Sequence, residues 1–273
     1  MSRIQSTFDA SRGRKALIAY ITAGDPTPER TPELVAALER GGVDLIELGV
    51  PFSDPIADGP VIQRGAERAL KAGTNVKKVL EIARTIRKTS QIPMLLFTYL
   101  NPVMRYGLDG LARDAAAAGI DGCLLTDLSV EEAASYVGSM RSAGLDTVFL
   151  AAPTSTPARM KLVAEYSSGF VYLVSRTGVT GEQVSVSAAV APLVASMRAV
   201  TKLPLAVGFG ISTPEQAREV ARLADGVVVG SAFVRLIEQG GDVEGFARSL
   251  RLGMDSKEPS EDGSQPGVAA PQP

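Results

Sequence analysis

The chain has 273 residues with 28 basic and 30 acidic side chains, no histidine and one cysteine. The balanced charge and the lack of a basic block exclude the electrostatic pattern of a nucleic-acid-binding protein, so we expect a small-molecule ligand. The lack of histidine excludes Ser-His and Cys-His nucleophile pairs and histidine zinc sites. Any acid–base chemistry must therefore use carboxylates, tyrosines, lysines or Cys123.

The cysteine count and the first residues bear on where the protein works. A single cysteine excludes an intrachain disulfide and a multi-cysteine metal site, and we expect Cys123 to pack in the core. The opening MSRIQSTFDA lacks an apolar signal core, and no stretch approaches the roughly 18 apolar residues of a membrane span. We therefore expect a cytoplasmic protein that does not enter a membrane.

Residues 4–10 place Ile4 and Phe8 at helical spacing, which predicts an N-terminal helix covering one end of the fold. From Ala16 onward, a strand, a loop and a helix recur. The apolar runs predict eight strands, at 17–22, 44–48, 94–99, 121–126, 147–151, 170–175, 204–208 and 225–229. Each interval is long enough for a crossover helix, so we predict the α/β class and a single closed (β/α)8 TIM barrel.

Two additions to the regular pattern are predicted. The longest interval, after the second strand, holds an acidic loop, an extra helix with the sequence IQRGAERALKAG and a regular helix over 75–89. The stretch SAFVRLI predicts a short helix after the eighth strand. We predict one catalytic domain over 1–254, because such barrels run to about 250 residues, and a disordered tail over 255–273, which is rich in Pro, Gly, Ser and acids.

The stretch 44–60, DLIELGVPFSDPIADGP, carries the most informative residues. Glu47 lies in a strand that is apolar on both faces, where an unpaired carboxylate costs several kcal/mol or has a raised pKa. The alternative is a strand carboxylate satisfied by a neighbouring strand. Asp58 precedes Gly-Pro and could simply form a turn, while Asp54 precedes Pro55 and could be a turn or helix cap.

Glycines gather after the sixth, seventh and eighth strands. They let backbone N–H groups approach an anion, and Ser231 adds a hydroxyl at a predicted helix start, which favours a phosphate monoester. The glycines are Gly178, Gly181, Gly208, Gly210 and Gly230. Each turn alone could be a tight connection. Ser212 followed by Glu215 predicts a structural capping box at the start of another helix.

Several motifs in order resemble the tryptophan synthase alpha subunit family. They are AYITAGDP, LIELGVPFSDPIADGP, VYLVSRTGVTG, LAVGFGIST and ADGVVVGSA, and the resemblance runs from about residue 16 to 252. It implies a barrel that cleaves indole-3-glycerol phosphate to indole and glyceraldehyde 3-phosphate by a retro-aldol reaction, without a metal or organic cofactor. It also implies a beta partner that holds pyridoxal phosphate and receives indole through a tunnel, in an alpha2beta2 tetramer.

The resemblance also implies roles for individual residues. Glu47 matches the general acid–base, and Asp58 matches the carboxylate facing the indole nitrogen. Side chains expected at the substrate are Tyr172, Tyr20, Ile62, Phe209 and Thr180, the last in a closing loop. Positions expected at the phosphate are Gly181, Gly210, Gly230 and Ser231. Asp54 is expected in a loop facing the partner. The chemistry requires a raised pKa for Glu47 and an ionised Asp58.

Three alternatives remain open from the sequence. One is a stand-alone lyase that releases free indole, which the sequence does not separate from a channelling subunit because dependence on the partner lies in the surface and in loop dynamics. Another is a non-catalytic, phosphate-binding activator of the beta subunit, which the presence of Glu47 and Asp58 disfavours. The last is a different phosphate-sugar barrel enzyme, for which the long acidic loop would have to be accidental.

Overall fold

The computed structural model describes residues 2–10, 14–174, 186–208 and 210–256. Its parallel strand segments are β1 (Ala16–Thr22), β2 (Leu45–Gly49), β3 (Met94–Thr98), β4 (Gly122–Leu125), β5 (Asp146–Thr147), β6 (Leu150–Ala151), β7 (Val171–Val174), β8 (Leu205–Gly208) and β9 (Gly226–Val229). Neighbouring strands follow the order β5-β4-β3-β2-β1-β9-β8-β7-β6. The two ends of this order, β5 and β6, are consecutive in the chain.

The stretch between β5 and β6 closes the sheet into a barrel. The N–H of Val148 donates to the carbonyl of Cys123 at 3.1 Å, and the N–H of Tyr172 donates to the carbonyl of Phe149 at 3.1 Å. The stretch 146–151 therefore pairs with β4 at its start and with β7 at its end. This confirms the predicted barrel, with one difference: the predicted fifth strand is broken into two short segments because it changes partner midway.

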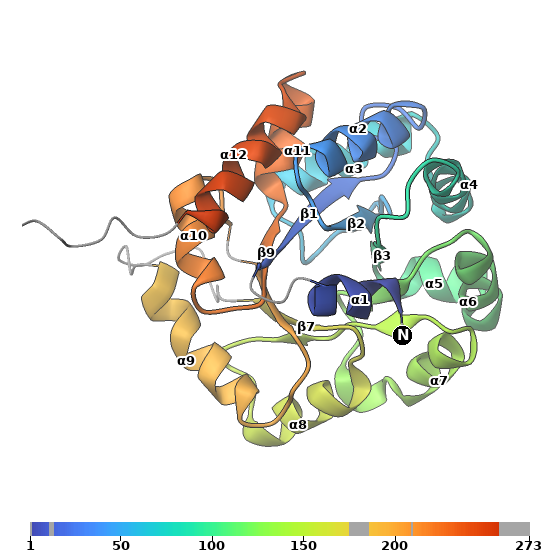
Figure 1. Ribbon diagram of the computed structural model, residues 1–273. Helices are drawn as coiled ribbons and strands as arrows, with labels where there is room; N and C mark the ends of the chain where they lie inside the picture. Colours follow the sequence, from blue (N-terminus) through green and yellow to red (C-terminus); the bar gives the residue numbers. More distant parts are fainter. Residues whose placement is uncertain (1, 11–13, 175–185, 209, 257–273) are drawn as a thin grey trace, which may run out of the picture.

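The helices surround the strands (Figure 1). They are α1 (Arg3–Ala10), α2 (Arg30–Arg40), α3 (Pro60–Lys71), α4 (Val76–Arg87), α5 (Leu100–Tyr106), α6 (Leu108–Ala117), α7 (Ala134–Ser142), α8 (Pro157–Tyr166), α9 (Val186–Arg198), α10 (Pro214–Ala221), α11 (Ser231–Glu238) and α12 (Val243–Asp255). The predicted extra helix is α3, and the predicted short helix after the last strand is α11. The last described helix, α12, ends at Asp255, which was predicted to be the first residue of the tail. Residues 257–273 of the predicted tail lie outside the described residues.

One helix start differs from its prediction. The N-cap of α10 is Thr213, whose hydroxyl accepts the N–H of Gln216 at 3.3 Å, and Ser212 lies one residue before it. Pro214 is then the first helical residue, where its missing N–H costs nothing. The prediction of Ser212 as the cap was therefore wrong by one position. Thr213 and Gln216 are three residues apart, as are Ser212 and Glu215, so both pairs have the spacing of a capping box.

Alternate strand residues fill the barrel interior. The fully enclosed inner side chains are Ile18, Leu45, Leu95, Leu124, Val148, Phe170, Ala206 and Val228. At one end, α1 lies across the strands (Figure 1). Its Ile4 is completely buried in this inner cluster, and the rings of Phe8 and Phe170 are 5.6 Å apart. The predicted covering helix is confirmed, and it seals the N-terminal end of the barrel.

Carboxylates secure the same N-terminal end. Each lies directly before a strand and accepts a backbone N–H from a neighbouring strand; these pairs are Asp44 with Leu17, Asp121 with Met94 and Asp225 with Leu205, at 2.8, 2.8 and 2.9 Å. Each also binds an arginine; these are Arg251, Arg87 and Arg198, respectively. All three carboxylates are bound to backbone N–H groups and to arginines. A carboxylate that is available for catalysis is therefore expected at the opposite, carboxyl end of the barrel.

Candidate active site

Glu47 lies in β2 and its side chain points into the barrel. It is fully buried, and neither carboxyl oxygen has a hydrogen-bond partner within the described part of the chain. Burial raises its pKa from the ordinary 4.5 to about 8. The carboxyl is therefore mostly protonated at neutral pH. The alternative of a carboxylate satisfied by a neighbouring strand is contradicted by these unpaired oxygens.

Two phenols stand around this acid. The α-carbon of Tyr20 is paired with that of Glu47 across β1 and β2, so both side chains point to the same face. Tyr172 points into the interior from β7, on the strand face that it shares with Phe170. Burial raises the pKa of both phenols, and the charges of Asp58 and Glu47 raise it further. Both hydroxyls therefore stay protonated.

Two glycines make room for these phenols. A Cβ added at Gly49 would lie 2.3 Å from the hydroxyl of Tyr20, and one at Gly208 would lie 2.3 Å from the hydroxyl of Tyr172. Any larger residue at either position would displace a ring. The ring of Phe97, on β3, completes this wall at 5.1 Å from that of Tyr20 in an edge-on arrangement. The carboxyl end of the barrel thus holds an aromatic pocket around a neutral acid.

Asp58 lies in the loop between β2 and α3 and is half-buried. Its backbone N–H closes a turn onto the carbonyl of Pro55 at 3.0 Å, so the turn alternative is correct for its backbone. Its side chain is also perturbed, because burial raises its pKa to about 6 while a hydrogen bond from Tyr99 acts in the opposite direction. Asp58 is therefore mostly ionised at neutral pH.

Tyr99 is a site residue that the sequence reasoning missed. It follows β3 directly, is 2 % exposed, and accepts the N–H of Ala57 through its hydroxyl oxygen at 3.1 Å. Its O–H can thus donate a hydrogen bond to the Asp58 carboxylate while its oxygen accepts the one from Ala57, the preceding residue of the loop. The available signal was its place at the carboxyl end of a barrel strand, where catalytic residues gather.

The remaining predicted substrate residues are only partly described. Ile62 lies in the first turn of α3 and is half-buried. Phe209, Thr180 and Gly181 lie outside the described residues. Asp54 is exposed, and its carboxylate accepts a hydrogen bond from the hydroxyl of Ser53 at 2.5 Å, so it does not belong to the pocket.

Two of the glycines predicted at a phosphate, Gly210 and Gly230, follow adjacent strands, whereas Gly178 and Gly181 lie outside the described residues. Strands β8 and β9 pair side by side, and Gly210 and Gly230 follow their last residues. Gly210 has a φ of +67°, which only glycine adopts readily, and an added Cβ would meet nothing within 4 Å. Gly230 is the N-cap of α11 and provides no side-chain cap, so the N–H groups of the first turn, starting at Ser231, lack a capping side chain.

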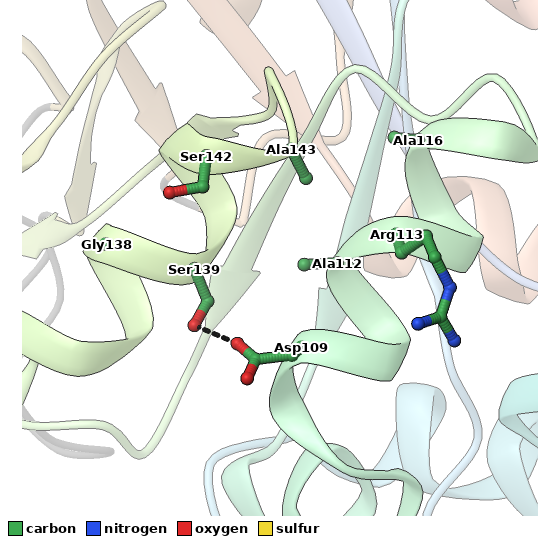
Figure 2. A pocket seen from close by; sticks show the side chains of 8 residues that line it. All are labelled: Asp109, Ala112, Arg113, Ala116, Gly138, Ser139, Ser142 and Ala143. Carbon is green, nitrogen blue, oxygen red and sulfur yellow. Dashed lines mark hydrogen bonds between the residues drawn. The ribbon is translucent and has the colours of Figure 1, made fainter.

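A separate cavity of about 580 Å³ lies between α6 and α7 (Figure 2). It is lined mainly by alanine, glycine and serine, and its Ser139 hydroxyl donates to Asp109 at 2.6 Å. The nearby Arg113 guanidinium is paired with Asp114 at 3.2 Å. These polar groups are thus paired with neighbouring side chains, unlike the carboxyl oxygens of Glu47.

Comparison with known proteins decides the family. The family model described as "Tryptophan synthase alpha chain" matches residues 8–260. The chain belongs to this family. A protein named tryptophan synthase alpha chain from Solibacter usitatus (strain Ellin6076) is 67% identical over 266 residues, covering 94% of this chain and 100% of that protein. A namesake from Geotalea uraniireducens (strain Rf4) is 51% identical over 262 residues, covering 93% and 98%.

Solved structures agree with this assignment. The tryptophan synthase subunit alpha from Legionella pneumophila str. Paris superimposes with a TM-score of 0.85 at 39% identity, over 93% of this chain and 99% of that one. A chain of Mycobacterium tuberculosis tryptophan synthase gives 0.86 at 39% identity, over 94% and 99%. Membership of the tryptophan synthase alpha chain family confirms the predicted barrel and the predicted lyase reaction, the cleavage of indole-3-glycerol phosphate.

Proposed function

We propose that Glu47 and Asp58 carry out the cleavage of indole-3-glycerol phosphate in this chain. The observation that carries the proposal is the protonated, unpaired carboxyl of Glu47 in the aromatic pocket. An acid that must deliver a proton near pH 7 needs a pKa in this range, and burial supplies it. Asp58, with the lower pKa of about 6, provides the negative charge that the same reaction needs.

The reaction proceeds in two proton transfers. Glu47 gives its proton to carbon 3 of the indole, and the ring nitrogen becomes positively charged. Asp58 accepts the N–H hydrogen bond and stabilises this charge, an effect worth about 3 kcal/mol in comparable sites. The Glu47 carboxylate then takes the proton of the neighbouring glycerol hydroxyl. The carbon–carbon bond breaks, its electrons return to the ring, and indole and glyceraldehyde 3-phosphate form with Glu47 protonated again.

The phosphate is placed at Gly210, Gly230 and Ser231. The open first turn of α11 offers backbone N–H groups and the positive end of a helix dipole, both of which favour an anion. The left-handed Gly210 provides a close approach from the neighbouring loop. Thr180 and Gly181 would complete this side as the substrate-covering loop, and Phe209 would join the indole pocket, as the family resemblance implies. This arrangement holds the substrate across the barrel mouth.

The partner is a tryptophan synthase beta subunit, and exposed apolar side chains around the acidic loop support a docking face there. Ile56 is 84% exposed and Met104 62%. Two adjoining hollows of about 370 and 290 Å³ share Phe52, Ser53 and Leu70, and Ile56 lines the smaller one. Apolar patches of this kind mark protein interfaces. Asp54 lies in the same loop, in accordance with a partner-facing role.

We further propose an alpha2beta2 tetramer in the cytoplasm, with pyridoxal phosphate in the beta subunit and carboxylate chemistry alone in this chain. Within the described ranges, no helix is long and apolar enough to cross a membrane. The stand-alone lyase differs from this proposal in one measurable respect. Indole release by the isolated chain should rise when the beta subunit is added if the two work together, and should stay constant if the chain works alone.

The catalytic assignment is tested by indole release from purified protein. Glu47→Gln should lower turnover by at least about a thousandfold, and Asp58→Asn by about a hundredfold or more, with glycerol 3-phosphate affinity retained. Glu39→Gln is the matched control. Glu39 lies outside the pocket, and its carboxylate accepts a hydrogen bond of 2.7 Å from the Ser90 hydroxyl. Wild-type turnover in Glu47→Gln would refute the assignment and would favour the phosphate-binding activator.

The docking face is tested by binding to the beta subunit. Ile56→Asp and Met104→Asp should weaken the complex by about tenfold or more, because each buries a charge in an apolar interface. Leu252→Asp is the control: Leu252 is 65% exposed, close to the 62% of Met104, but lies on α12. Equal affinity of all three variants for the beta subunit would reject this face. Light scattering of the complex measures the tetramer directly.

A further inference from the structure

Asp25, in the loop after β1, is 1% exposed and therefore needs a partner. Arg68 of α3 provides one by binding both carboxylate oxygens, each at 2.8 Å. The same guanidinium reaches the Glu238 carboxylate of α11 at 2.7 Å. One arginine thus joins three elements that approach the mouth of the barrel from different parts of the chain.

A second arginine strengthens the link between α3 and α11. Arg64, one turn before Arg68, holds both oxygens of Glu238 at 2.9 Å. Glu238 consequently has its pKa lowered to about 2, first by the hydrogen bond from Arg64 and then by the nearby positive charges. Because Glu238 is partly exposed, this outer pair alone contributes little to stability.

The backbone of α3 is also seated closely on its neighbours. A Cβ added at Gly65 would lie 2.9 Å from a methyl group of Val234 on α11 and 3.1 Å from a carboxylate oxygen of Asp25. Just beyond the end of α3, Thr74 lies so close to Gly24 that a Cβ there would be 1.9 Å from its hydroxyl. The arginine contacts therefore add to close packing of α3 against α11 and against the loop after β1.

The two helices joined in this way bear different parts of the site. Helix α11 follows β9 after a single residue, Gly230, so the barrel itself fixes its start. Helix α3 follows the acidic loop 50–59, whose residues 53, 54, 56 and 57 are exposed. Asp58 lies two residues before this helix. The position of Asp58 thus depends on contacts that hold α3 from the side.

We propose that Arg68 is a positioning residue for the cleavage reaction, which holds α3 against the loop after β1 and against α11 and thereby fixes Asp58 relative to the phosphate-binding turn. The inference rests on the proposed roles of Asp58 and of the α11 turn. The alternative is an ion pair that only stabilises the fold. Buried ion pairs are often no more stabilising than apolar replacements, so stability alone is a weak reason for this one.

The test compares Arg68→Lys with Arg251→Lys. Lysine keeps a charge beside Asp25 but lacks the planar fork, so it cannot hold both oxygens and Glu238 together. Arg251 is the control because its guanidinium also binds a carboxylate, that of Asp44, together with the carbonyls of Gly42 and Lys15, at the opposite end of the barrel. Both variants should lose some thermal stability, and only the first should change catalysis.

For Arg68→Lys, kcat should fall about tenfold or more, since a small misplacement of a catalytic group has this effect, while glycerol 3-phosphate affinity stays within about twofold. The acid limb of the pH profile should also move to lower pH, because a loosened Asp58 is better hydrated. The titratable groups that face Asp58 are the phenols of Tyr20, Tyr99 and Tyr172. None of them ionises in that range.

Glu238→Gln provides a second, safer variant, since it breaks the exposed half of the network and leaves the Asp25 pair intact. It should change kcat and the acid limb in the same direction by a smaller amount, and it decides the matter if Arg68→Lys does not fold. Wild-type kcat and acid limb in the folded variants, or an equal kinetic loss in Arg251→Lys, would overturn the proposal. Asp58→Asn separates this from failure of the proposed function: full turnover there would refute the role of Asp58 itself.

Discussion

Glu47 and Tyr20 are paired across the parallel strands β1 and β2, with both side chains directed into the barrel. The pairing places a carboxyl group beside a phenol in the barrel interior, where burial raises the pKa of Glu47 to about 8. Asp58, on a half-exposed loop, has a pKa of about 6. Two acids of the same chemical type are thus held in opposite protonation states at neutral pH.

The pH dependence of cleavage follows from this difference. Asp58 must be ionised and Glu47 protonated, so kcat/KM should form a bell with an acid limb near pH 6 and a basic limb near pH 8. Steady-state kinetics over this range provide the check. A rate that keeps rising above the predicted basic limb would mean that ionised Glu47 starts the reaction.

Stability should also depend on the proton of Glu47. Its folded pKa of about 8 exceeds the ordinary 4.5, so the folded state holds a proton that the unfolded state has released. The stabilisation of the folded state by this proton is complete below about pH 4.5 and is lost as pH rises through 8. Between these two values the free energy of unfolding falls by about 1.4 kcal/mol per pH unit. Wild type should therefore lose stability relative to Glu47→Gln as pH rises over this window. Urea unfolding at several pH values measures the difference, and parallel curves would contradict it.

Tyr99→Phe should shift the acid limb to higher pH. The variant removes the hydrogen bond that lowers the pKa of Asp58, while burial, which raises it, remains. The matched control is Tyr106→Phe, because the Tyr106 hydroxyl donates to Asp114 at 2.8 Å on the outer helices α5 and α6. The pH profile of kcat/KM measures both. A shift in the control of the same size would show that the effect is not local to Asp58.

Gly210→Asp should lower the affinity for glycerol 3-phosphate by about tenfold or more, since it adds a negative charge where the anion is placed. Gly240→Asp is the matched control: its φ is +66° against +67° at Gly210, and both glycines have open space around the missing Cβ. Both changes should cost a similar 1–2 kcal/mol or so of backbone strain. Calorimetric titration separates the two effects, and equal ligand affinities would reject the phosphate placement.

The features readable from the sequence were those set by local pattern. Buried parallel strands are apolar on both faces, so the barrel and the isolated acid Glu47 were evident from their neighbours in the chain. The helices α3 and α11 followed from their periodicity. The family resemblance added the roles of Asp58 and Tyr172.

The features that were missed depend on distant contacts. Nothing near Tyr99 in the chain indicates that its hydroxyl meets Ala57, and nothing near Arg68 indicates that it meets Asp25. The break between β5 and β6 arises because one stretch pairs with two different neighbours. These contacts follow from closure of the barrel, which a pattern along the chain does not contain.

The protonation state of Glu47 is the point on which the whole mechanism depends. It is measured most directly by NMR titration of protein labelled with carbon-13 at glutamate carboxyl groups, with Glu47→Gln used to assign the signal. We predict a midpoint near pH 8 for this carboxyl. A midpoint near the ordinary value of 4.5 would contradict the account, because the acid would then have lost its proton before the substrate arrives.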